Sequence, residues 1–133
     1  MTKQDLNKKV EILYKNILLL QLVNAGHNSM SKKQVEYNAF VYNLAYEVLE
    51  HAVKASKWNL FQAVSFKIED LLGSNFVAVN KQDYNAIVKQ KIEFQVRWKN
   101  LKRGNKSFFE KYRANHLMAI EEIEKRCIRN LSW

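Results

Sequence analysis

The chain has 133 residues, a length typical of one domain, and its 47% hydrophobic content is too high for a disordered protein. Its 22 basic and 13 acidic residues give a net charge of +9, which favours negatively charged partners. Cys127 is the only cysteine, which excludes an intrachain disulfide and a zinc site built on several cysteines, and indicates a reducing compartment.

The absence of proline, together with only three glycines, predicts long helices, because proline breaks helix interiors and glycine loosens them. Apolar residues recur at steps of three and four along five segments, and each segment opens with a pair of polar residues at the spacing of a helix cap. The expected helices begin at Thr2, Ser31, Asn59, Asn80 and Ser107.

The glycines predict where three of these helices end. Gly26, Gly73 and Gly104 each follow the end of an apolar pattern, where a left-handed cap favours the residue without a Cβ. The connections are short, apart from residues 74–80, which we expect either to form a small strand or to pack over one end of the core. The sequence therefore predicts an all-α, compact antiparallel bundle of four to five helices, forming a single domain over 1–133.

Signals for catalysis are weak. Of the three histidines, His27 falls in an expected loop, and His51 shares a helix face with Glu47 but lacks the second Glu/His set that a di-iron bundle needs. His116 falls in an apolar stripe near Arg113, which fits a partly buried histidine better than a catalytic one, although a small enzyme of unfamiliar type stays open. The chain has no phosphate-binding glycine loop and no nucleophile elbow, so we expect neither an enzyme, a metal nor a cofactor.

The positive charge is concentrated in residues 81–106. This segment holds eight cations against two acidic residues, a net charge of +6 in 26 residues, and leaves only +3 for the other 107. Such a concentration is the electrostatic footprint of a surface for phosphates, acidic membranes or acidic proteins. The candidate binding residues are Lys89, Lys91, Arg97, Trp98, Lys99, Lys102, Arg103 and Lys106.

Each part of this candidate surface also has a purely structural explanation. Cations in a last helical turn stabilise the helix through its macrodipole, and this alone accounts for Lys99, Lys102 and Arg103. The neighbouring rings, which either stack on bases or fill the core, are Phe94, Trp98, Phe108 and Phe109.

Two non-catalytic functions follow from this pattern. The first is a basic helical module that contacts the nucleic-acid backbone or a ribonucleoprotein. The alternative is a protein-binding inhibitor or adaptor that docks on an acidic partner or on a nucleic-acid-binding protein. The longest apolar run, residues 17–23, is interrupted by Gln21 and is too short to span a membrane, so we expect a soluble, cytoplasmic protein whose oligomeric state stays open.

Overall fold

The computed structural model describes residues 2–25, 32–72 and 81–111 of the chain. Its helices are α1 (Lys3–Ala25), α2 (Lys32–Lys54), α3 (Trp58–Leu72) and α4 (Lys81–Gly104), and a further helical turn covers 106–111. These described ranges contain no strand, and the fold is the predicted all-α bundle.

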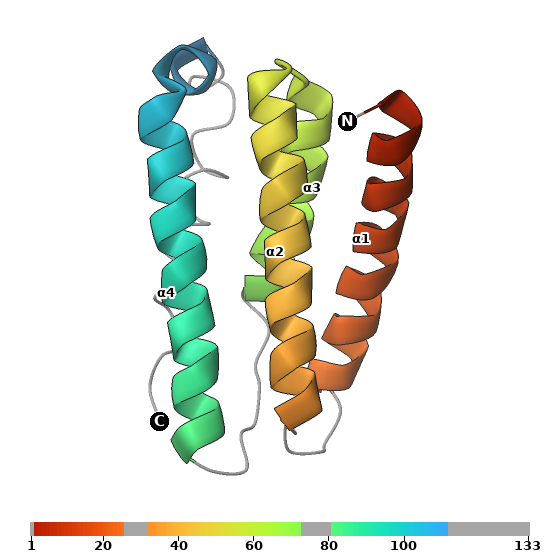
Figure 1. The fold of residues 1–133 in the computed structure, drawn as a ribbon, viewed down its shortest axis with the longest axis vertical. Coiled ribbons are helices and arrows are strands. Elements are labelled where there is room, and N and C mark those ends of the chain that lie inside the picture. Colours follow the sequence, from red (N-terminus) through yellow and green to blue (C-terminus); the bar gives the residue numbers. More distant parts are fainter. Residues whose placement is uncertain (1, 26–31, 73–80, 112–133) are drawn as a thin grey trace.

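Helix α2 is the centre of the described bundle. It packs against α1, α3 and α4, and α1 also packs against α3. Successive helices run in opposite directions, so α2 and α4, which are not consecutive, run parallel and end at the same end of the bundle (Figure 1). This parallel pairing brings residues from the ends of α2 and α4 together.

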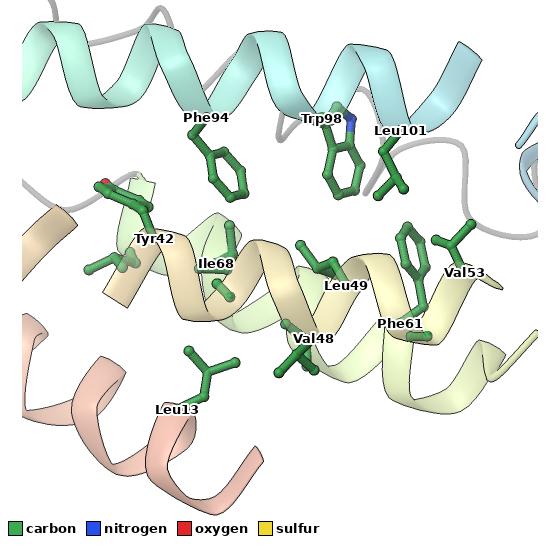
Figure 2. Close-up of a cluster of buried hydrophobic side chains, with 14 of the residues drawn as sticks. Leu13, Tyr42, Val48, Leu49, Val53, Phe61, Ile68, Phe94, Trp98 and Leu101 are labelled. Carbon is green, nitrogen blue, oxygen red and sulfur yellow. The ribbon is translucent and has the colours of Figure 1, made fainter. Parts of the chain in front are cut away.

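An apolar core lies between α2 and its three neighbours. Phe94, Trp98 and Leu101 point from α4 toward α2, where they meet side chains of α2 and α3 (Figure 2). Phe61 of α3 stacks on Trp98 with ring centroids 5.6 Å apart and an interplanar angle of 20°. Aromatic pairs at this separation stabilise the fold by more than their buried area alone would, so this cluster anchors α3 and α4 to one core.

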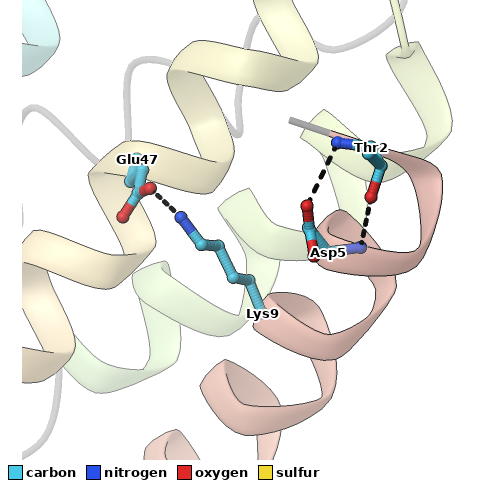
Figure 3. A network of polar contacts seen from close by, with 4 residues as sticks. All are labelled: Thr2, Asp5, Lys9 and Glu47. Atoms are coloured by element: carbon cyan, nitrogen blue, oxygen red, sulfur yellow. Dashed lines mark hydrogen bonds and ion pairs between the residues drawn. The ribbon is translucent and has the colours of Figure 1, made fainter.

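The first helix begins as its capping pattern predicts. The backbone N–H of Asp5 donates to Thr2 Oγ1 over 3.1 Å, and the Thr2 N–H donates back to Asp5 Oδ2 over 3.4 Å (Figure 3). Hydrogen bonding from the side chain and the backbone N–H of Thr2 to the Asp5 carboxylate lowers the pKa of Asp5, because it favours the charged form. Figure 3 also shows the ion pair between Lys9 and Glu47, which ties α1 to α2.

Two predicted helix starts are wrong. Helix α3 begins at Trp58, so Asn59 lies inside it and does not cap it. Trp58 is held by its contacts with Phe61 and Phe108, at 5.5 and 5.9 Å between ring centroids, and this packing outweighs the local capping pattern. The last helical turn likewise begins at residue 106, one position before the predicted cap at Ser107.

The left-handed cap predicted at Gly104 is also wrong. Gly104 is the last residue of α4, and no glycine in the described ranges has a positive φ. The Asn105 side chain ends α4 instead, because its Nδ2 donates to the Leu101 carbonyl over 2.9 Å. The predictions for Gly26, Ser31, Gly73, Asn80 and the 74–80 connection lie outside the described residues.

Candidate functional site

Two of the eight predicted binding residues are buried. The side chains of α4 alternate between the core and solvent, and Lys91 and Trp98 fall on the inner face with exposed fractions of 2% and 0%. A partner cannot reach side chains that are this deeply covered. We therefore correct the predicted surface by removing Lys91 and Trp98 from it.

The predicted aromatic platform belongs to the core. Phe94, Trp98, Phe108 and Phe109 are all buried, and the last three contact Phe61. Their spacing at helical intervals reflects the inner face of the bundle and not a stacking surface for bases. These four rings are therefore not accessible for stacking with bases.

Arg97 joins α4 to α2. Its guanidinium lies 3.9 Å from the ring centroid of Tyr46, and its Nη1 donates to Asn43 Oδ1 over 2.5 Å. Burial raises the pKa of Tyr46, as does the hydrogen bond that Tyr46 shares with Glu50. Because one face of the Arg97 guanidinium and its Nη1 are both engaged by α2, Arg97 helps to hold the two helices together.

The other predicted cations lie on or near the outer face of α4. Lys89 is exposed and forms an ion pair with Glu93, at 4.0 Å one helical turn away. Lys99 and Arg103 are exposed, and Lys102 is half-buried and engaged with the chain. Lys99 and Arg103 are four residues apart, so they follow each other along one exposed stripe of the helix.

A cationic hollow lies where α2 and α4 end. We call it the basic hollow; it measures about 800 Å³ including its open mouth, and its lining includes Lys54 of α2 together with Arg103 and Lys106. Val53 and Phe108 contribute apolar side chains, and none of the lining residues is acidic. Outside this lining, the Lys54 ammonium pairs with the carboxylate of Glu50 at 3.5 Å, one helical turn away on α2. The full lining consists of Val53, Lys54, Ser56, Arg103, Gly104, Asn105, Lys106, Ser107 and Phe108.

The structure thus adds four polar residues that the sequence pattern missed: Lys54, Ser56, Asn105 and Ser107. Lys54 lies 49 positions before Arg103 in the chain, and only the parallel arrangement of α2 and α4 brings the two together (Figure 1). No local signal in the sequence marks this proximity.

The outer stripe of α4 also carries exposed apolar side chains. Ile92 and Val96 are 43% and 51% exposed, and they lie between Lys89 and Lys99 along the helix. Aliphatic side chains make no favourable contact with phosphates. This part of the stripe differs chemically from the basic hollow.

Of the three histidines weighed for catalysis or metal binding, the described residues include only His51. His51 is half-buried near the end of α2, and the described ranges hold no cluster of three or more His, Cys, Asp or Glu side chains suited to a metal. His27, Arg113, His116 and Cys127 lie outside the described residues.

None of the helices in the described part of the chain is long and apolar enough to cross a membrane. No protein-family model, curated protein or solved structure matches the chain, so its function has to be inferred from its own side chains.

Proposed function

We propose that this protein binds the sugar-phosphate backbone of nucleic acids at the end of α4, without catalysis. The basic hollow is the observation that carries the proposal, since Lys54, Arg103 and Lys106 line it from separate segments and none of its lining residues is acidic. The exposed ion pair of Lys54 with Glu50 is worth at most about 1 kcal/mol, so a phosphate can compete for this ammonium. Lysine and arginine side chains displace counterions from phosphates, and this term supplies most sequence-independent affinity.

Helix stability explains only part of this cluster. Lys54 and Arg103 lie in the last turns of their helices, where a cation favourably meets the negative end of the macrodipole. Lys106 lies in the first turn of the next helical segment, where the macrodipole disfavours a cation. A ligand with negative charge accounts for Lys106 as well as for the other two.

Reversing the charge of the hollow tests the proposal. We expect fluorescence anisotropy to show that wild-type protein binds mixed-sequence single-stranded DNA and RNA at low salt. The triple variant Lys54→Glu, Arg103→Glu, Lys106→Glu should lose that binding, because three phosphate contacts become repulsive. The fold should survive, since exposed charges contribute at most about 1 kcal/mol each.

A matched control separates the site from the overall charge. The variant Lys3→Glu, Lys8→Glu, Lys15→Glu changes the net charge by the same amount on exposed positions of α1. It should retain most of the affinity. Equal losses in the two triple variants, or a wild type that binds no nucleic acid at low salt, would refute the proposal.

A protein partner is the second candidate, and the exposed pair Ile92 and Val96 favours it. An acidic protein surface with an apolar centre would match these two side chains and the flanking Lys89 and Lys99. If this function holds, Ile92→Asn with Val96→Asn should release a captured partner and leave nucleic-acid affinity unchanged. The control, Ile12→Asn with Leu18→Asn, alters exposed apolar residues of α1 and should release nothing.

A further inference from the structure

We infer that the basic hollow binds the terminal phosphate of a nucleic-acid strand, and this inference rests on the proposed function. The hollow gathers several kinds of donor in one place. Lys54 and Lys106 supply ammonium groups, Arg103 supplies a guanidinium, and Ser56 and Ser107 supply hydroxyls. These donors come from the end of α2, the turn after it, the end of α4 and the helical turn that follows.

A phosphomonoester matches this set better than a bridging phosphodiester does. Near neutral pH it carries a charge of about −1.5 to −2 and three strongly accepting oxygens, whereas a diester has a single negative charge. The planar fork of an arginine can donate hydrogen bonds to two of those oxygens, and lysines act as point charges beside it. Three cations in one hollow therefore favour the end of a strand over a position within it.

The outer stripe of α4 supplies the direction in which the strand continues. Lys99 lies one helical turn below Arg103, about 6 Å along the helix axis, where it can meet the next phosphate. Beyond Lys99 the stripe becomes apolar at Val96 and Ile92. The cationic track is therefore short and leads to the hollow, as expected of a surface that recognises one end of a strand.

The test compares oligonucleotides that differ only at their ends. One single-stranded sequence is prepared with a 5′-phosphate, with a 3′-phosphate and with neither, and each form is titrated against the full chain by fluorescence anisotropy. We expect one phosphorylated form to bind about tenfold more tightly than the unphosphorylated form, since a hydrogen bond to a charged group adds this much affinity. Inorganic phosphate should compete with the phosphorylated strand for the hollow and so reduce this difference in affinity.

Variants then locate the preference. Replacing Lys54 and Lys106 with glutamine should reduce the ratio of the two affinities to one, because the monoester loses two of its three cations. The control pair, Lys8→Gln with Lys15→Gln on α1, should leave the ratio unchanged. Circular dichroism of all variants checks that the helices are intact.

The possible failures are distinguishable. If all three oligonucleotides bind equally and the glutamine variant weakens them alike, the protein binds backbone and the terminal-phosphate inference is wrong. If no oligonucleotide binds, the proposed function fails together with the inference. If a neutral phosphoserine peptide binds as tightly as the phosphorylated strand, the hollow recognises phosphomonoesters of proteins and the assignment to nucleic acid is overturned.

Discussion

Ser56 adopts a backbone conformation that side chains usually avoid. Its φ is 54°, and two hydrogen bonds close the turn around it: the Ser56 N–H donates to the Val53 carbonyl over 3.2 Å, and the Lys57 N–H donates to the Ala52 carbonyl over 2.7 Å. This is the Schellman arrangement, which most often has glycine at the left-handed position. A serine there retains the steric cost of its Cβ.

Replacing Ser56 with glycine should therefore stabilise the protein. Removing the Cβ relieves a cost of about 1 kcal/mol, and the turn itself is unchanged. The gain should appear in urea denaturation as a higher midpoint with the same slope. The same replacement at Ser107, which lies in a helical turn and has no positive φ, should lower the midpoint instead. A loss of stability in Ser56→Gly would contradict this account of the turn.

Gly104→Ala should also stabilise the chain, by up to about 1 kcal/mol, because alanine favours helix over glycine. Gly104 ends α4 without a positive φ, and a Cβ built there meets nothing within 4 Å. The thermal midpoint of the variant should rise by a few degrees. A fall in the midpoint would indicate that the left-handed cap expected from the sequence does form in solution.

These positions show how far local patterns predict single residues. The reciprocal cap of Thr2 and Asp5 could be predicted because all its atoms lie within four residues. The position of Gly104 wrongly predicted a left-handed cap at the end of α4, where the Asn105 side chain supplies the terminal hydrogen bond instead. Ser56 could not be predicted, since a serine gives no local signal for a left-handed conformation.

At the scale of elements, α4 is attached to α2 by polar contacts as well as by the core. Arg97 contacts Asn43 and the Tyr46 ring, and Gln90 Nε2 donates to the Val35 carbonyl over 2.8 Å. The spacing of Arg97 among other cations predicted a binding role. Its engagement across the helix pair was not predictable, because periodicity does not specify which helices are neighbours.

Truncating Arg97 should therefore affect stability more than binding. We expect Arg97→Ala to destabilise the fold by about 1 kcal/mol, through loss of the cation–π contact and of one hydrogen bond. Lys99→Ala, two residues away on the exposed face, should change stability by less than about 0.5 kcal/mol. Chemical denaturation of both variants measures the difference. Equal effects on stability would show that Arg97 is not a structural contact.

At the scale of the molecule, the all-α bundle could be predicted but its site only in part. Composition and apolar periodicity predicted the helices, because both reflect the formation of a core. Arg103 and Lys106 could be predicted from local charge, whereas Lys54 joins them only through the parallel packing of α2 and α4. Trp98 was predicted on the binding surface but lies in the core. An aromatic ring among cations has the same sequence signature in both places.

The slope of affinity against salt concentration, both as logarithms, measures how many phosphates the whole surface neutralises. If Lys54, Lys99, Arg103 and Lys106 each contact one phosphate, the logarithm of affinity for unphosphorylated single strands should fall with the logarithm of salt concentration at a slope of about −2.8. Replacing Arg103 and Lys106 with glutamine should reduce that slope to about −1.4, because two counterion-releasing contacts are lost.

Titrations at several salt concentrations measure both slopes, and the Lys8→Gln, Lys15→Gln variant should keep the wild-type slope even where its affinity is lower. Net charge acts on every variant through long-range attraction, whereas the slope responds to cations in contact with phosphate. A slope that is unchanged in the Arg103, Lys106 variant would therefore place the nucleic acid elsewhere on the molecule, whatever the change in affinity.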